Sequence, residues 1–172
     1  GTLLNFVSHE IDTLLHWLGP IDEVAAWLSD DAARADLWPR LASGAAVSLS
    51  VAANAFLGSG HGYEIHGDEG TLTLRNPGPD HARGWTLRLG TRASNRLESQ
   101  PVEGLAQEFA DGRVAATARL VARFVDAVLG GPAMVPDLAD ALKVQQVLDA
   151  ALQAHAARCW VKVSHDSEPI PT

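Results

Sequence analysis

The first twenty residues predict an amphipathic helix that begins almost at the first residue. Apolar side chains recur there at helical spacing, and Gly19-Pro20 is a helix stop signal. The apolar residues of this pattern are Leu3, Phe6, Val7, Ile11, Leu14, Leu15, Trp17 and Leu18. At about 100° per residue, four polar residues fall in one stripe on the opposite side, namely Asn5, His9, Asp12 and His16. This stripe is either the solvated face of the helix or the polar wall of a site.

The rest of the 172-residue chain predicts several strands, two helices and a final strand. Strands are expected at residues 21–29, 45–56, 63–66, 71–75, 85–92 and 160–164, with a hairpin between the third and fourth. Helices are expected at residues 114–129, ended by Gly130-Gly131, and at 137–157, capped by Asp137. Because of Trp38-Pro39, residues 30–42 are expected to lack a long regular element, and residues 93–113 are expected to be irregular. This order predicts an α+β fold with one mostly antiparallel, open-faced β-sheet and helices packed on one face.

The composition excludes several classes of partner and location. A net charge of −8 provides no basic surface for nucleic acid or for an anionic membrane. No apolar stretch reaches the roughly 18 residues that a transmembrane helix needs, and no signal peptide is visible. The single cysteine, Cys159, is expected to be a packed structural thiol and suits a reducing, cytoplasmic location. A helix this close to the first residue suggests a piece of a longer protein.

Neither a dinucleotide site nor a metal site is expected within the chain. The stretch Gly58-Ser59-Gly60-His61-Gly62 lacks the spacing of G-x-G-x-x-G, and a predicted strand follows it where that motif needs a helix. His9-Glu10 begins like the zinc motif H-E-x-x-H, but Thr13 stands where the second His would be. The remaining histidines show no ligand spacing.

Aromatic and basic residues near the predicted strands each leave two interpretations open. Four tryptophans are expected to be core or interface residues, with sugar stacking as the alternative: Trp27, Trp38, Trp85 and Trp160. Five arginines are expected to be solvated charges, with recognition of an anionic substrate group as the alternative: Arg75, Arg83, Arg88, Arg92 and Arg96. Trp85, Leu87 and Leu89 alternate with polar residues, so the open face of the sheet is expected to be covered by a second copy in a symmetric dimer.

Several segments together resemble the C-terminal domain of the glucose–fructose oxidoreductase / inositol dehydrogenase (Gfo/Idh/MocA) family. Members typically have an Asp, a His four residues later, an Asp three residues further on, and then W-L-G. His9, Asp12 and Trp17-Leu18-Gly19 match this pattern, whereas Asn5 replaces the first Asp. The resemblance covers residues 1–164, and its further segments are residues 21–24 (I-D-E-V), 63–72 (Y-E-I-H-G-D-E-G-T-L), 124–128 (F-V-D-A-V), 140–142, 147–150 and 161–163.

The resemblance implies a substrate-binding and oligomerisation domain at residues 1–164, followed by a flexible tail at residues 165–172. It implies a fold like that of the C-terminal domain of glyceraldehyde-3-phosphate dehydrogenase. Family members hold NAD or NADP on an upstream Rossmann domain, which also carries a catalytic Lys in a Glu-Lys-Pro motif. Neither Lys143 nor Lys162 has that setting, so this chain alone is expected to bind no cofactor.

The same resemblance implies that His9 is the catalytic residue of the stripe. An imidazole can exchange a proton with the hydroxyl of a sugar, an inositol or a similar substrate. Asn5 and Asp12 are the candidate substrate-binding residues; Asn5 can hydrogen-bond a polyol but cannot act as a base, and Asp12 either orients His9 or faces water. Because Asn5 replaces an acid, a non-catalytic binding or assembly domain of the same fold is an alternative. An unrelated α+β ligand-binding module is another.

Overall fold

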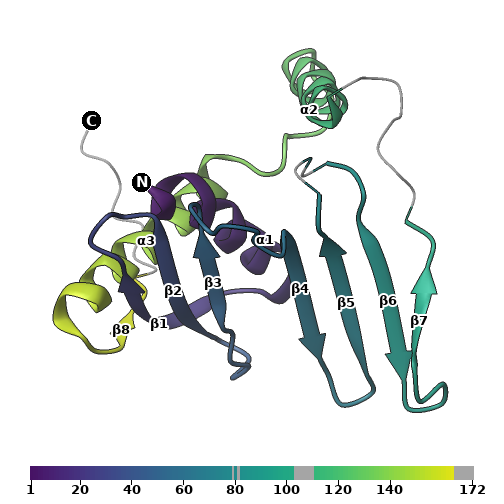
Figure 1. The fold of residues 1–172 in the computed structure, drawn as a ribbon. Helices are drawn as coiled ribbons and strands as arrows, with labels where there is room; N and C mark the ends of the chain where they lie inside the picture. Colours follow the sequence, from purple (N-terminus) through teal and green to yellow (C-terminus); the bar gives the residue numbers. More distant parts are fainter. Residues whose placement is uncertain (79, 81, 103–110, 165–172) are drawn as a thin grey trace. The chain divides into compact units, whose positions relative to one another are not determined.

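The computed structural model describes residues 1–78, 80, 82–102 and 111–164; the predicted tail, residues 165–172, lies outside them. The chain forms two compact units, the first of Gly1–Phe56 and Val135–Thr172 and the second of Leu57–Met134. All strand pairing is antiparallel among the described residues, and helices and strands do not alternate along the chain (Figure 1). The α+β class is therefore confirmed.

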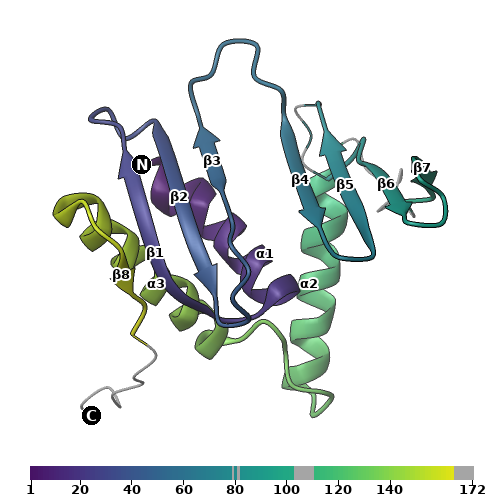
Figure 2. The ribbon, with the colours of Figure 1, turned by 90° about the horizontal axis from the view of Figure 1, so that it is seen from below.

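The first unit is a four-stranded sheet with helices on one face. Its strand order is β3 (Leu49–Ala52), β2 (Arg34–Leu41), β1 (Ile21–Leu28) and β8 (Val161–Lys162). A π-helical turn, η1 (Leu3–Val7), leads into α1 (Ser8–Leu18), and α3 is the helix Leu138–Ala157. Figure 2 shows α1 and α3 on the same side of these strands. Helices on one face of the sheet are therefore confirmed for this unit.

Strand alternation determines the core of the first unit. In β2, Ala35 and Leu37 are buried, whereas Trp38 and Arg40 are exposed on the other face. The buried face meets the apolar sides of α1 and α3. The side chains with essentially no exposure in this core are Val7, Ile11, Ile21, Val24, Ala35, Leu37 and Ala151.

One prediction for the first unit is wrong: residues 34–41 form a regular strand despite Trp38-Pro39. Pro39 pairs with Val24 of β1, and its carbonyl oxygen accepts the N–H of Val47 at 3.0 Å on the opposite edge. Because the nitrogen and the carbonyl of a strand residue face the same edge, the missing N–H of Pro39 faces that edge too. The proline therefore removes no hydrogen bond to β1. On the edge that it does face, the strand β3 begins only at Leu49.

The face of this sheet opposite the helices carries exposed aromatic side chains. Trp27, Trp38 and Trp160 are all exposed, so they are not core residues. Cys159 is also exposed, which corrects the expectation of a packed thiol. It lies in the turn between the end of α3 and β8, where the chain is too short to bury it.

The second unit is a four-stranded meander followed by one helix. The strands β4 (His61–His66), β5 (Gly70–Asn76), β6 (Thr86–Thr91) and β7 (Leu97–Gln100) pair in sequence order. The predicted hairpin is confirmed: His66 pairs with Thr71, and the Gly67 N–H donates to the Gly70 carbonyl at 2.8 Å.

Two expectations about the strands are corrected by the pairing pattern. Residues 97–100 form a strand inside the segment that was expected to be irregular. This strand is held by hydrogen bonds to β6, and its sequence, with one apolar residue in four, shows no strand pattern. Hydrogen-bonded pairing among the described residues also forms two sheets of four strands instead of one sheet. The glycine-containing segment 53–60 separates β3 from β4 in the chain.

The helix α2 (Gly112–Val128) starts at a well-defined cap. The Asp111 side chain accepts the N–H of Arg113 at 3.0 Å, and Asp80 Oδ2 accepts the N–H of Gly112 at 3.2 Å. The predicted Asp137 cap of α3 is likewise confirmed, as part of a capping box. Neither α2 nor any other helix among the described residues is long and apolar enough to cross a bilayer.

Candidate functional site

The polar stripe of the first helix lies on the exposed side of η1 and α1. Leu3, Val7, Ile11 and Leu14 are buried against the sheet side at intervals of three or four residues. The four polar residues that the sequence placed opposite them are all exposed: Asn5, His9, Asp12 and His16. The structure therefore brings these four residues to one accessible helix face.

The helix begins with a π-helical turn that the sequence analysis missed. The Ser8 N–H donates to the carbonyl of Leu3, five residues earlier, so this turn is wider than an α-helical one. The wider turn keeps Leu3 and Val7 buried while Leu4, which a regular helix would bury, is exposed. Single-turn π-bulges occur frequently at functional sites, but a pattern read at 100° per residue carries no signal for them.

The start of this helix is fixed to the turn between β1 and β2. Thr2 is buried, and its N–H donates to the Ala32 carbonyl at 3.0 Å. Ala32 has a left-handed backbone with φ of 53°, which turns its carbonyl toward the helix start. Asn5 therefore stands on a backbone that is hydrogen-bonded to the sheet.

The polar residues of the stripe differ in what they contact. Within the described residues, the side chains of Asn5, His9 and Asp12 make no hydrogen bond. His16 lies close enough to Asp140 to contribute to a lowered pKa of that carboxyl, whose main cause is the hydrogen bond from Lys143 at 2.9 Å. Asn5, His9 and Asp12 thus remain available to a ligand, whereas His16 faces the charged pair on α3.

Apolar side chains border the stripe on its exposed side. Leu4 is 59% exposed, Phe6 41% and Trp17 45%. Phe6 and Trp17 lie at the margin of the apolar arc of the helix, which explains why helical periodicity alone included them in the buried set. A polar stripe bordered by exposed apolar side chains is typical of a surface that binds a ligand or another domain.

The arginines of the second unit are engaged in local contacts. Arg75 donates to Glu64 at 3.1 Å and Arg96 to Glu98 at 2.9 Å, while Arg88 and Arg92 donate to the carbonyls of Leu97 and Asp68. These contacts favour the interpretation of solvated strand charges over an anion site. Across the part of the chain that the structure describes, no group of three or more His, Cys, Asp or Glu side chains could hold a metal ion.

Comparison with known protein families identifies the family of this chain. Residues 1–163 match the model of the oxidoreductase family C-terminal alpha/beta domain, known as Gfo/Idh/MocA. The chain belongs to the Gfo/Idh/MocA oxidoreductase family. The match begins at the helix that carries the stripe and continues to the residue after β8, so both units are parts of one family domain.

Relatives within and near this family agree with the match. An uncharacterized oxidoreductase of Synechocystis sp. is 29% identical over 192 aligned residues, covering 95% of this chain and 50% of that protein. Among solved structures, levoglucosan dehydrogenase in complex with NADH superposes with a TM-score of 0.78 at 23% identity, over 96% of this chain and 51% of that one.

An aldose-aldose oxidoreductase from Caulobacter crescentus, complexed with glycerol, gives a TM-score of 0.72 at 17% identity, over 94% of this chain and 47% of that one. At these identities, the likeness to both solved enzymes establishes the fold. The chain spans about half the length of the Gfo/Idh/MocA relatives that it matches.

Proposed function

We propose that this chain is the substrate-binding and oligomerisation half of an NAD(P)-dependent oxidoreductase acting on a sugar, an inositol or a similar hydroxylated compound. The observation that carries the proposal is the exposed row of Asn5, His9 and Asp12 in a Gfo/Idh/MocA domain that spans half the length of its relatives. Solved neighbours include a levoglucosan dehydrogenase complexed with NADH and levoglucosan, which supports both the cofactor class and the substrate class. The isolated chain would be inactive, and a cytoplasmic location accompanies the proposal.

The described residues of this chain do not fit a dinucleotide. Phosphate binding of this kind needs a glycine-rich turn that opens a helix, whereas the glycines of residues 58–62 lead into the strand β4. The nicotinamide cofactor, which accepts or supplies hydride when bound, would therefore be held by an upstream Rossmann domain. No step below is assigned to it.

His9 would exchange the proton of the substrate hydroxyl. When a secondary alcohol is oxidised, its hydroxyl loses a proton, and an exposed imidazole that makes no hydrogen bond within the described chain can accept it. Asn5 would hydrogen-bond a neighbouring hydroxyl with both its amide oxygen and its amide nitrogen. Asp12, one turn beyond His9, would accept a hydrogen bond from substrate or stabilise the protonated imidazole.

The first test concerns the division of labour with the upstream domain. NADH is titrated by calorimetry into the isolated chain and into the full-length protein. We expect binding only to the full-length protein. Micromolar binding to the isolated chain would overturn the assignment of the cofactor to the other half.

A non-catalytic binding or assembly domain of the same fold is the second candidate, and Asn5 favours it. The resemblance implies an acid at this position, and an amide cannot act as a base. Full-length protein carrying Asn5→Asp is compared with the unchanged protein across pH with a panel of sugars and inositols. If the unchanged protein is an enzyme, it turns over and Asn5→Asp alters its rate or pH optimum. Turnover that appears only with Asn5→Asp favours the non-catalytic domain.

The oligomerisation role is proposed for the open sheet of the second unit. Register places Tyr63, Ile65, Leu72, Leu74, Leu87 and Leu89 on one face of that sheet. None of them is buried, and Trp85 stacks on Tyr63 with ring centroids 6.0 Å apart. An apolar face of this kind is covered in a stable protein, and a symmetric dimer would cover it with the same face of a second copy.

A further inference from the structure

Asp12 gives the stripe a negative charge that no cation of its own helix balances. Residues 1–33, which include η1, α1 and β1, contain no Lys and no Arg. Among the described residues, the Asp12 side chain makes neither a hydrogen bond nor an ion pair. It is exposed about one helical turn beyond His9, the residue proposed to exchange the substrate proton. A substrate on the stripe therefore meets an unneutralised carboxylate close to the reacting hydroxyl.

The start of α3 adds negative charge beside the same helix. The pKa of Asp140 is lowered mainly by its hydrogen bond from Lys143 and, to a smaller extent, by the charge of His16, so the end of α1 lies near the start of α3. The pKa of Lys143 is raised mainly by this hydrogen bond, at 2.9 Å, and further by the charge of Asp137. Two carboxylates thus share one ammonium group, which leaves no positive charge over for Asp12.

The cations on the strands of the first unit point away from the helices. Arg34 and Arg40 alternate with buried residues of β2, so both lie on the face opposite α1 and α3. Arg34 pairs there with Asp36 at 3.1 Å, and Arg40 pairs with Glu23. Lys162 of β8 directly precedes a residue of the core and therefore also faces away from it.

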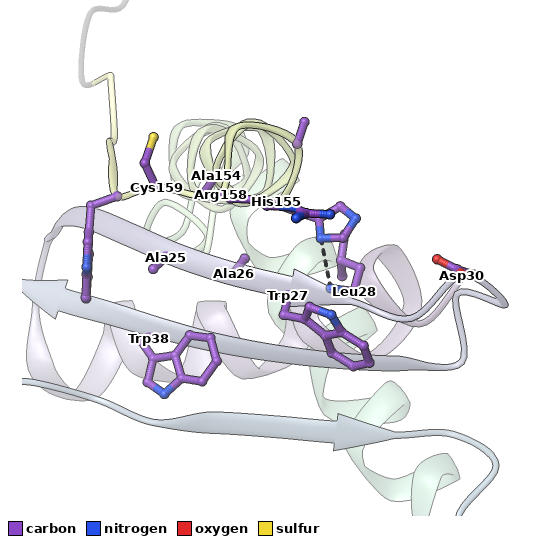
Figure 3. A pocket seen from close by; sticks show the side chains of 12 residues that line it. Ala25, Ala26, Trp27, Leu28, Asp30, Trp38, Ala154, His155, Arg158 and Cys159 are labelled. Atoms are coloured by element: carbon purple, nitrogen blue, oxygen red, sulfur yellow. Dashed lines mark hydrogen bonds between the residues drawn. The ribbon is translucent and has the colours of Figure 1, made fainter.

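Arg158 follows α3 at the end opposite Asp140. The eighteen residues between them correspond to roughly 27 Å along the helix axis, at 1.5 Å per residue. Figure 3 shows Arg158 with His155 beyond the edge of β1, where the Leu28 N–H donates to His155 Nδ1 at 3.1 Å. Within the first unit, the Lys and Arg side chains therefore leave the charge of Asp12 uncompensated.

We propose that Asp12 makes this site selective for sugars and inositols that carry no anionic group, and that it excludes uronates and sugar phosphates. The inference rests on the proposed function and names the substrate class of the same site. Like charges brought together at a binding site disfavour the wrong ligand, so the carboxylate discriminates by repulsion. The same carboxylate can accept a hydrogen bond from an uncharged hydroxyl. Asn5 has no positive charge with which to bind an anionic group.

The test uses the full-length protein and substrates in matched pairs that differ by one anionic group. The pairs are glucose and glucuronate, galactose and galacturonate, and myo-inositol and its monophosphate. Initial rates give kcat and KM, and calorimetry on the protein–NADH complex gives binding that does not depend on turnover. Asp12→Asn removes the charge and Asp12→Glu keeps it. Asp22→Asn is the matched control because it removes an exposed carboxylate of β1 outside the stripe.

We expect kcat/KM of the unchanged protein to be about tenfold or more higher for the uncharged member of a pair than for the anionic one. Asp12→Asn should narrow this gap about fivefold, mainly through a lower KM for the anionic member, whereas Asp12→Glu and Asp22→Asn should preserve it. High ionic strength should also narrow the gap, because salt screens exposed charges.

The outcomes separate this inference from the proposed function. Equal use of both members of a pair, or a gap in KM and in binding that survives Asp12→Asn, would overturn the selectivity while the oxidoreductase role stands. Absence of binding and turnover for every member of every pair would overturn the proposed function, and the selectivity with it.

Discussion

The two units are built on different principles, although each contains a four-stranded antiparallel sheet. The first unit buries aliphatic side chains from α1, α3 and its strands, among them Ile11, Val24 and Leu37 at 0% exposure. Among the described residues of the second unit, the most buried side chain is polar. Asn76 is fully buried, donates to the Asp80 carbonyl at 2.8 Å and accepts the Gly78 N–H at 3.0 Å.

The helices show the same difference. Both α1 and α3 contribute residues to the core of their unit, whereas α2 leaves Phe124 56% and Val128 69% exposed. A helix with exposed apolar side chains is stabilised by something that it packs against. The apolar core therefore lies mainly in the first unit, which also carries the candidate site residues Asn5, His9 and Asp12. The second unit leaves apolar side chains of α2 and of its sheet exposed or half-buried.

The largest expected effect tests where the chemistry lies. In the full-length oxidoreductase, His9→Ala should lower kcat by about 10²-fold or more, because general acid–base groups contribute that much. His16→Ala on the same helix and His66→Ala in the second unit are matched controls and should change kcat little. Steady-state kinetics with the preferred sugar give the comparison. Equal losses from His9→Ala and His16→Ala would show that the stripe is structural.

The next effect tests the difference in cores. Leu37→Ala should cost about 2–5 kcal/mol of unfolding free energy, the usual range for a buried leucine. Leu87→Ala, the same substitution on the half-buried sheet of the second unit, should cost about 1 kcal/mol. Urea unfolding followed by circular dichroism measures both. Similar losses of unfolding free energy for the two variants would mean that apolar packing stabilises the second unit as much as the first.

A smaller effect is expected on assembly. Leu89→Arg places a charge on the apolar face of the second sheet and should convert a dimer to a monomer near 18.2 kDa. Ser99→Arg adds the same charge on the opposite face and should leave the dimer intact. Light scattering at micromolar concentration distinguishes the two. A monomeric mass for the unchanged chain would remove the proposed role of this face.

The smallest effect concerns the N-terminal cap of α2. Hydrogen bonds from the side chain and backbone of Arg113 lower the pKa of Asp111 from 3.8 to about 2. A depressed folded-state pKa stabilises the α2 start above the ordinary value of 3.8, and this contribution is lost as the pH falls toward 2. Circular dichroism should therefore show a small loss of helix between these pH values. Asp111→Asn should remove that step, and an unchanged titration in the variant would contradict the assignment to Asp111.

Local chemistry made much of this fold predictable. The stripe, the hairpin around residues 67–70 and the Asp137 cap each depend on residues close together in the chain, and all three lie where the sequence placed them. The errors share a different cause. Pro39 is tolerated in β2 because of where β3 begins, and β7 is ordered by its pairing with β6, neither of which local sequence encodes.

The candidate site was predictable in position and less so in detail. Periodicity places Asn5, His9 and Asp12 on one face, since that depends only on helical geometry. The π-helical turn beneath Asn5 follows Thr2, whose N–H donates to the Ala32 carbonyl thirty positions along the chain, and local sequence does not signal that contact. The grouping of exposed indoles on one face of the first unit's sheet likewise depends on the register of three strands, so the tryptophans could be noted in the sequence but not brought together.

The hydrogen bond between Leu28 and His155 has a consequence for how the first unit avoids aggregation. An exposed sheet edge has unpaired backbone groups that can pair with a strand of another chain, which is a route to aggregation and fibres. The strand β8 protects β1 only near Glu23 and Val24, and the imidazole of His155 occupies the Leu28 N–H beyond it. One side chain from a helix thus satisfies a backbone N–H that an incoming strand would otherwise pair with at this edge.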